Sequence, residues 1–183
     1  VFAENQAIQW LIDLAGLPAS AGGVFVQGGT IGNLSALVVA RAEARKKQGN
    51  PERWVIACSE EAHSSIVSAA NVMDVDVLKV AVDKNGRLQG AAVAEAIDHL
   101  HSTTKARVFA VVATSGTTNL GIIDDLKGIG KAAHDRDIWF HVDGAYGLAA
   151  LCAPSVRKMF DGIEAADSFI VDPHKWLFAP YDA

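Results

Sequence analysis

The sequence predicts an α/β fold built on a mostly parallel, doubly wound sheet. Apolar runs with strand character alternate with helical patterns along almost the whole chain, which is the order expected of such a fold. The predicted strands are also continuously apolar, as strands are when helices cover both faces of a sheet. Ligands of such sheets bind beyond the carboxyl ends of the strands, so unusual residues should gather there.

The first third of the chain predicts a helix, a short strand and a long helix. Apolar residues at helical spacing indicate the first helix over about 8–15, which Gly16 and Pro18 end. A short strand is predicted over 24–26. A helical pattern then runs over about 31–48, and basic residues in its last turns suit the negative end of a helix dipole.

The remaining elements continue the alternation. Strands are predicted over 54–57, 77–82, 107–113, 138–142 and 168–171, and helices over 63–73, 91–101 and 124–135. Asp124 or Asp125 is the expected N-cap of the last helix. No repeat, low-complexity tract or linker interrupts the pattern, so one domain is expected over residues 1–183.

Composition excludes several classes of protein. Half of the 183 residues are apolar and a fifth are charged, as in soluble globular domains. The net charge of -5 and the absence of a basic stripe argue against nucleic acid or an anionic membrane as the main partner. No apolar run approaches the ~20 residues that span a bilayer. Cys58 and Cys152 have no metal or redox spacing, so a reduced, cytoplasmic location is expected.

Two polar loops could contact an anion or a polar ligand. The loop Gly28-Gly29-Thr30-Ile31-Gly32-Asn33 opens a helix, where glycines allow close approach and free N–H groups favour a phosphate. A plain glycine-rich turn with a threonine cap is the other interpretation. The loop Thr114-Ser115-Gly116-Thr117-Thr118-Asn119 brings hydroxyls to the end of a strand, but viewed alone it is better explained as an ordinary polar loop.

Two further segments could carry acid–base or nucleophilic chemistry. Alternation puts His141 and Asp143 on one strand face, where the carboxylate could keep a ring nitrogen protonated or simply cap the next turn. His141 could equally be a satisfied core histidine. Lys175 follows an apolar strand beside His174 and Trp176, and partial burial would favour its neutral, nucleophilic amine over the usual solvated lysine.

A metal site is the main alternative for these residues. Its ligands would come from His63, His141, Asp143 and His174. Their spacings resemble no zinc signature, so we predict that the chain binds no metal.

Together the motifs resemble the group II pyridoxal-phosphate (PLP) dependent decarboxylases, which include aromatic-L-amino-acid, histidine and glutamate decarboxylases. His-Val-Asp-x-Ala-Tyr at 141–146 and Pro-His-Lys-Trp at 173–176 carry the resemblance, which extends from about residue 5 to 181. The resemblance implies the large domain of a fold-type I PLP enzyme, a homodimer, and a small amino-acid substrate.

The resemblance also implies residue roles. Lys175 matches the Schiff-base lysine, Asp143 the carboxylate at the pyridine nitrogen, and His63 the histidine stacked on one ring face. These three are the expected catalytic residues. The other expected cofactor-binding residues are Ala145 on the second ring face, Thr118 near the ring hydroxyl, Gly29 and Thr30 at the phosphate, and Ser168 and His174 around the phosphate and the lysine.

One position departs from the pattern. Animal aromatic-type members usually carry Asn where this chain has Asp172. An ionised carboxylate beside a phosphate is unfavourable. We therefore expect Asp172 to point elsewhere or to share a proton, and we do not count it as a phosphate ligand.

The activity implied by the resemblance is decarboxylation of an L-amino acid to an amine and CO₂. Trp176 favours an aromatic or histidine-type substrate, because glutamate-type members usually carry Met at this position, and we expect an aromatic one. The alternatives are another fold-type I PLP enzyme, such as an aminotransferase, a desulfurase or an aldehyde synthase, and an inactive fragment.

The ends of the chain predict a longer parent protein. The sequence starts at Val1 rather than Met and stops at Tyr181-Asp182-Ala183 without a terminal signal. The resemblance implies that an N-terminal segment, a mobile loop with a tyrosine proton donor, and a small C-terminal domain lie outside residues 1–183. We therefore expect the segment alone to lack full activity.

Overall fold

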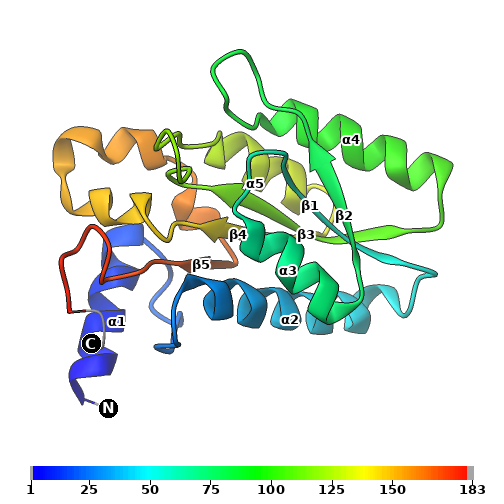
Figure 1. The fold of residues 1–183 in the computed structure, drawn as a ribbon. Coiled ribbons are helices and arrows are strands. Elements are labelled where there is room, and N and C mark those ends of the chain that lie inside the picture. The colour runs from blue at the N-terminus through cyan, green and yellow to red at the C-terminus, as the bar shows by residue number, and fades with distance from the viewer. Residues whose placement is uncertain (1, 181–183) are drawn as a thin grey trace.

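The computed structural model describes residues 2–180 and has the predicted α/β architecture (Figure 1). Within these residues, five parallel strands form one sheet in the order β2-β1-β3-β4-β5. Their bounds are Trp54–Ser59 for β1, Asp76–Val80 for β2, Arg107–Thr114 for β3, Trp139–Asp143 for β4 and Ser168–Ile170 for β5. The predicted domain limits at 1 and 183, and the end of the resemblance at 181, lie outside the described residues.

Helices cover both faces of the sheet, so the doubly wound prediction is confirmed. In Figure 1, α2 and α3 lie below the sheet, and α4 and α5 lie above it. The helix bounds are Phe2–Ala15 for α1, Gly29–Gln48 for α2, Ser64–Met73 for α3, Gly90–Thr103 for α4 and Leu126–His134 for α5. None of the helices in the described part of the chain combines the length and the apolar character needed to cross a bilayer.

Strand alternation sends successive side chains of β4 to opposite faces of the sheet. Phe140 and Val142 pack into the apolar core beneath α4 and α5. His141 and Asp143 therefore face α2, where both bond to the amide of Asn33. The predicted shared face of His141 and Asp143 is thus confirmed.

The path of the chain creates a topological switch point between β1 and β3. After β1 the chain adds β2 on one side of it, and then returns to add β3 on the other. The connections that leave the carboxyl ends of β1 and β3 therefore diverge. A crevice at this point is the usual ligand position in open α/β sheets.

The strand predicted over 24–26 is wrong. This segment has no strand pairing, and Val24 is 71% exposed. It runs past α1, where the backbone N–H of Phe25 donates to the Glu4 carboxylate at 3.3 Å. Its β-branched residues favour an extended backbone, but a strand needs a neighbour to complete its hydrogen bonds.

Helix α1 begins at Phe2, six residues before the predicted start at about residue 8, and the other helix starts differ from the predictions by one or two residues. Helix α2 begins at Gly29 rather than Ile31, and His63 stands just before α3 as its N-cap. Asp125 is the N-cap of α5 and accepts from the Gly128 N–H at 3.0 Å. Asp124 instead accepts from the backbone of Leu88 and Thr114, and burial raises its pKa to about 6.

Three 3₁₀ helices fill the connection between β4 and β5. They are η1 (Gly147–Cys152), η2 (Pro154–Phe160) and η3 (Ile163–Ala165). No helix was predicted here, because turns this short carry no sustained amphipathic period.

Candidate active site

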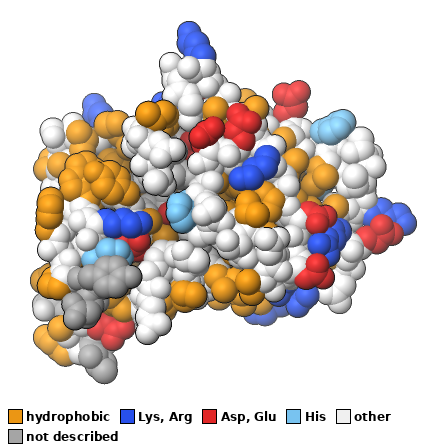
Figure 2. Space-filling view, in the orientation of Figure 1, with side chains coloured by type: hydrophobic (Ala, Val, Ile, Leu, Met, Phe, Trp, Pro, Cys, Tyr) orange, Lys and Arg blue, Asp and Glu red, His pale blue; other side chains and the backbone are white. Residues whose placement is uncertain are grey.

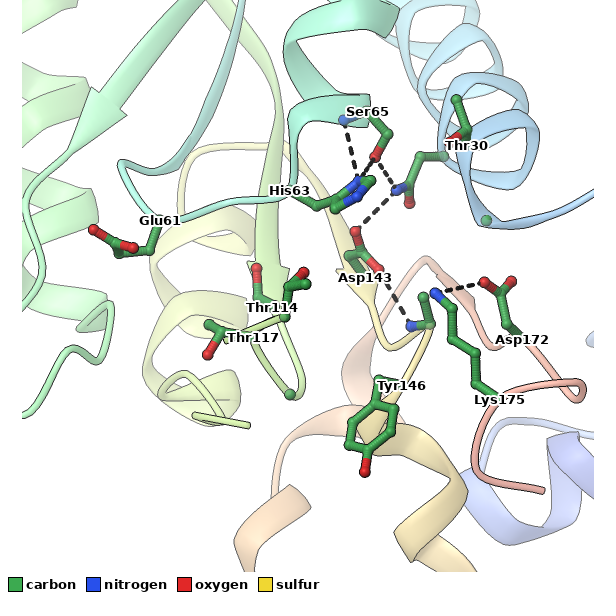
Figure 3. Close-up of a pocket in the computed structure, with 15 residues that line it drawn as sticks. Thr30, Glu61, His63, Ser65, Thr114, Thr117, Asp143, Tyr146, Asp172 and Lys175 are labelled. Atoms are coloured by element: carbon green, nitrogen blue, oxygen red, sulfur yellow. Dashed lines mark hydrogen bonds and ion pairs between the residues drawn. The ribbon is translucent and has the colours of Figure 1, made fainter. Parts of the chain in front are cut away.

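A pocket lies at the carboxyl ends of the strands, beside the switch point (Figure 3). Its walls come from the start of α2 and from the segments that follow β1, β3, β4 and β5. The lining residues are Gly29, Thr30, Asn33, Glu61, His63, Ser65, Thr114, Gly116, Thr117, Thr118, Asp143, Ala145, Tyr146, Asp172 and Lys175. All the predicted site residues are among them except Ser168 and His174.

Asp143 is held at the end of β4 by two donors. Its side chain is buried, and its Oδ2 accepts from Asn33 Nδ2 at 2.9 Å. Its Oδ1 accepts from the backbone N–H of Ala145 at 3.2 Å. The two bonds fix the orientation of the carboxylate and still leave lone pairs that face the pocket.

His63 projects from the turn between β1 and α3 (Figure 3). Its Nδ1 accepts from the backbone N–H of Ser65 at 3.2 Å and lies 2.9 Å from the Ser65 hydroxyl oxygen. Because a backbone N–H can only donate, Nδ1 is the acceptor in this bond, which favours the tautomer with the proton on Nε2.

Lys175 and Asp172 form an ion pair at the edge of the pocket. Lys175 Nζ lies 2.8 Å from Asp172 Oδ2, with the lysine side chain 40% exposed and the aspartate side chain 8% exposed. The expectation that Asp172 points elsewhere or shares a proton is wrong, because its carboxylate lines the pocket and pairs with the lysine ammonium. Breaking this pair is a precondition for any nucleophilic use of the amine.

The Asp172 carboxylate also lies against the start of α2. A Cβ built on Gly29 would stand 3.0 and 3.1 Å from the two Asp172 oxygens and 3.1 Å from Ile170 Cδ1. Glycine therefore suits this close approach, because a larger residue would press on the Asp172 carboxylate and the Ile170 side chain. The free N–H groups at the helix start remain available to an anion.

Thr114 carries an unsatisfied hydroxyl at the end of β3. The residue is 5% exposed and lines the pocket, yet its Oγ1 has no hydrogen-bond partner among the described residues. In the sheet register Thr114 lies directly beside Asp143. A buried hydroxyl of this kind suits a polar ligand that completes its bonding.

The donor set as a whole fits PLP. Asp143 suits a protonated ring nitrogen, Lys175 supplies an amine, and the glycine cradle at α2 suits a phosphate. His63 and Ala145 line the same space, as the resemblance requires of the residues on the two ring faces.

Ser168 and His174 do not line the pocket. Ser168 lies at the start of β5, where its hydroxyl accepts from Trp139 Nε1 at 2.8 Å and contacts His141 Nδ1 at 2.8 Å. His174 precedes Lys175 in the chain, outside the lining set. Their roles at the cofactor remain predictions of the resemblance.

His141 is a satisfied core histidine, which was one of the two interpretations of its position. It is fully buried and bonds to Asn33 Oδ1 at 2.9 Å and to Ser168 Oγ at 2.8 Å. Burial lowers the pKa of His141 to about 4, and the nearby Asp143 charge only partly opposes this effect. The ring is therefore neutral at pH 7.

This depressed pKa predicts a pH-dependent stability. The folded-state value of about 4 lies below the ordinary 6.5, so the unfolded chain binds more protons between these limits. The contribution is present above pH 6.5 and is lost as the pH falls towards 4, by roughly 3 kcal/mol. His141→Asn should reduce the acid-induced loss of unfolding free energy, measured by urea titration from pH 7 to 4.

The comparison should use pH slopes rather than absolute stabilities, because any substitution at a buried site lowers stability. His99→Asn, at an exposed histidine of α4, is the matched control and should retain the full slope. An unchanged slope in His141→Asn would contradict the prediction. Asp124 acts with the opposite sign, because its raised pKa favours the folded state at acidic pH.

Across residues 2–180, no group of three or more His, Cys, Asp or Glu side chains could hold a metal ion. Asp143 and His141, two members of the alternative metal site, bond to Asn33 instead.

The sequence-based interpretation assigned no role to Asn33, Ser65 or Thr114. Asn33 stood in the quoted loop, and its position four residues after Gly29 puts both on one face of α2. That spacing, together with a polar residue on a helix that covers a sheet, was the available signal. Ser65 carried no signal beyond its closeness to His63, and Thr114 none beyond its place in the hydroxyl-rich loop.

Comparisons with known proteins identify the family of the chain. The family model described as the pyridoxal-dependent decarboxylase conserved domain matches residues 1–183. An aromatic-L-amino-acid decarboxylase of Bacillus atrophaeus is 37% identical over 182 residues, which make up 98% of this chain and 37% of that protein. An L-2,4-diaminobutyrate decarboxylase of Rhizobium meliloti (strain 1021) is 38% identical over 184 residues, covering 97% of this chain and 36% of that protein.

A solved structure also has this fold over nearly the whole chain. The crystal structure of mouse CSAD aligns with a TM-score of 0.91 and 33% identity, over 98% of this chain and 40% of that chain. The chain thus spans less than half the length of the relatives that it matches. The family model covers the whole chain, and the chain belongs to the pyridoxal-dependent decarboxylase family.

Proposed function

We propose that this chain is the cofactor-binding core of a PLP-dependent enzyme that decarboxylates an L-amino acid to an amine and CO₂. The observation that carries the proposal is the grouping of Asp143, His63 and Lys175 around one pocket at the switch point. PLP, when bound, would supply the electron sink that stabilises the charge left on Cα as CO₂ departs.

Each residue has a defined task in this proposal. Lys175 is the nucleophilic amine, which becomes available once its ion pair with Asp172 opens. Asp143 holds the proton at the ring nitrogen, and its fixed orientation avoids reorganisation during the reaction. His63 and Ala145 confine the ring between them, and Thr30 and the start of α2 donate to the phosphate.

We further propose an aromatic substrate. Trp176 stacks on Tyr146 beside the pocket, with ring centroids 5.0 Å apart and planes 7° from parallel. Both rings are nearly half exposed and could extend an aromatic surface towards a substrate side chain. Turnover of aromatic amino acids, L-2,4-diaminobutyrate and L-glutamate by the intact protein would test this preference, and the products would separate amine from aldehyde or keto acid.

The function is tested by PLP binding to the intact protein, followed by borohydride reduction and peptide mass mapping. A reduced pyridoxyl adduct on Lys175 is the expected result. A folded protein that forms no adduct would favour an inactive relative. An adduct on another lysine would contradict the assignment of Lys175.

Replacement of Asp172 by Asn is expected to tighten PLP binding severalfold. The Asp172 carboxylate lies against Gly29 at the proposed phosphate site, and it pairs with the amine that PLP must reach. Removing this charge relieves repulsion with the phosphate and frees Lys175. The dissociation constant, measured by spectroscopic titration at low and high salt, checks the effect. Asp161→Asn, at an exposed site, is the control, and weaker binding in Asp172→Asn would argue against the prediction.

We propose that the protein forms a homodimer and that α2 contributes to the interface. Ile31, Val38 and Val39 on α2 are 44%, 44% and 50% exposed, and the preceding segment 24–26 is also apolar and exposed. Figure 2 has hydrophobic side chains along its lower edge, where α2 runs in Figure 1. Burial of such a surface stabilises association. Analytical ultracentrifugation of the intact protein, with Val38→Glu as the disrupting variant, tests the proposal.

We also propose a cytoplasmic location. Both cysteines are free, with Cys58 buried and Cys152 exposed, and neither forms a disulfide. Unpaired thiols are typical of a reducing compartment. Cell fractionation would test the location.

A further inference from the structure

A network of buried hydrogen bonds centres on Asn33, at the wall of the pocket. The Asn33 amide nitrogen is 2.9 Å from Asp143 Oδ2 and 2.9 Å from Ser65 Oγ. Its oxygen is 2.9 Å from His141 Nε2. Asn33 is 1% exposed, and all of its side-chain hydrogen-bonding groups are used within the protein.

Two groups fix the direction of the hydrogen bonds in the first part of this network, because one can only donate and the other can only accept. The indole N–H of Trp139 can only donate, so the Ser168 hydroxyl oxygen accepts from it. The Asp143 carboxylate can only accept, so Asn33 turns its N–H group towards Asp143 and its oxygen towards His141. His141 Nε2 therefore donates to Asn33 Oδ1, and in the neutral ring Nδ1 accepts from the Ser168 hydroxyl.

The second part of the network follows the same direction. With its oxygen committed to His141, Asn33 directs one N–H to the Asp143 carboxylate and the other to the Ser65 oxygen. The Ser65 hydroxyl can then donate to His63 Nδ1. A flipped Asn33 amide would set its oxygen against the Asp143 carboxylate and its N–H group against a protonated nitrogen. Only one arrangement satisfies every member.

We propose that Asn33 is a positioning residue that holds the two cofactor-facing groups, Asp143 and His63, in a fixed mutual arrangement. The inference rests on the proposed function, in which Asp143 meets the ring nitrogen and His63 covers a ring face. A single amide supplies one proton to each branch, so it cannot rotate to favour one branch without losing the other (Figure 3). Ser168, His141 and Trp139 act behind it by locking the orientation of that amide.

The direction of the network can be tested without cofactor. In the cofactor-free intact protein labelled with ¹⁵N-histidine, the ring-nitrogen chemical shifts report where each proton resides. We expect His141 to be neutral at pH 7, and the proton of each ring to reside on Nε2 while Nδ1 accepts. A His141 that is protonated on Nδ1, or on both nitrogens, would overturn the assigned direction.

Two substitutions then test the positioning role. Asn33→Leu removes every polar contact at nearly constant volume, and Asn33→Asp keeps the shape but replaces the donors with a second carboxylate. Each should weaken PLP binding on the order of tenfold or more, because a bond to a charged group is lost. Each should also shift the pH profile of the bound cofactor's absorbance, because Asp143 no longer has a fixed orientation.

Ser65→Ala separates the two branches. It interrupts the link to His63 and leaves the Asn33–Asp143 bond intact. We expect a changed His63 Nδ1 chemical shift, because this nitrogen loses the Ser65 hydroxyl and keeps only the backbone N–H of residue 65, together with an unchanged pH profile of the cofactor absorbance. Asn71→Asp, at an exposed asparagine of α3, makes the same chemical change outside the network and should match the unaltered protein in every measurement.

The outcomes separate this inference from the proposed function. PLP affinity and pH profiles like those of the unaltered protein in both Asn33 variants would refute the positioning role. Lower thermal stability and affinity with an unmoved pH profile would also refute it, because a purely structural residue behaves in that way. If the unaltered protein binds no PLP, the proposed function fails, while the histidine tautomers still test the network.

Discussion

Replacement of Lys175 by Ala is expected to abolish the borohydride-stable pyridoxyl adduct and to reduce CO₂ release from the intact protein to background. Within the described residues, Lys175 is the lysine that lines the pocket. Its amine pairs with the Asp172 carboxylate, which lies against Gly29 at the start of α2. Without the amine the cofactor can bind only through noncovalent contacts, and the covalent step is lost. Mass mapping after reduction, together with radiometric CO₂ release, measures both effects.

Lys84→Ala provides the control for the loss of a lysine. Lys84 is exposed in the loop between β2 and α4, and its removal should leave the adduct and the turnover unchanged. A borohydride-stable adduct that persists in Lys175→Ala would show that another amine holds the cofactor, and the assignment of Lys175 would be withdrawn.

Replacement of Asp143 by Ala is expected to reduce turnover about a hundredfold or more while part of the PLP binding remains. The carboxylate is buried and oriented by two donors, so its charge acts at short range on a ring nitrogen in a site with little solvent. Removal of a preoriented electrostatic group of this kind typically costs 10²–10³ in rate. The other contacts, at Lys175 and at the start of α2, still hold the cofactor.

Single-turnover CO₂ release at saturating PLP separates this effect from weaker binding. Asp161→Ala, at an exposed aspartate, should behave like the unaltered protein. Near-normal turnover in Asp143→Ala would refute the role of the carboxylate. A complete loss of PLP binding would mean that Asp143 serves mainly to hold the cofactor.

The strands and the helices on both faces of the sheet could be predicted because they depend on local patterns. A continuous apolar run such as β3 indicates a strand, and an amphipathic segment such as α5 indicates a helix, within a few residues. The segment 24–26 has the same β-branched character, but whether it pairs depends on a neighbouring strand, which lies elsewhere in the sequence. Local propensity cannot supply that information.

The candidate site was predicted in outline and missed in detail for a related reason. Asp143 and Lys175 stand in distinctive motifs at the ends of strands, so the topology alone brings them together. The role of Asn33, by contrast, depends on hydrogen-bond partners that lie 110, 108 and 32 residues away along the chain. The surroundings of Ser168 also depend on residues far away in the sequence. Its hydroxyl contacts Trp139 and His141, and the residue does not line the pocket.

The alternation along β4 also has a consequence for folding. A slip of one residue in the pairing of β4 with β3 would turn Asp143 and His141 towards the apolar core under α4 and α5. The same slip would bring Phe140 and Val142 to Asn33, whose amide would then lack partners. The polar residues proposed for chemistry thus also disfavour misregistered chains, so substitutions at Asn33 or Asp143 should lower the yield of correctly folded protein as well as its activity.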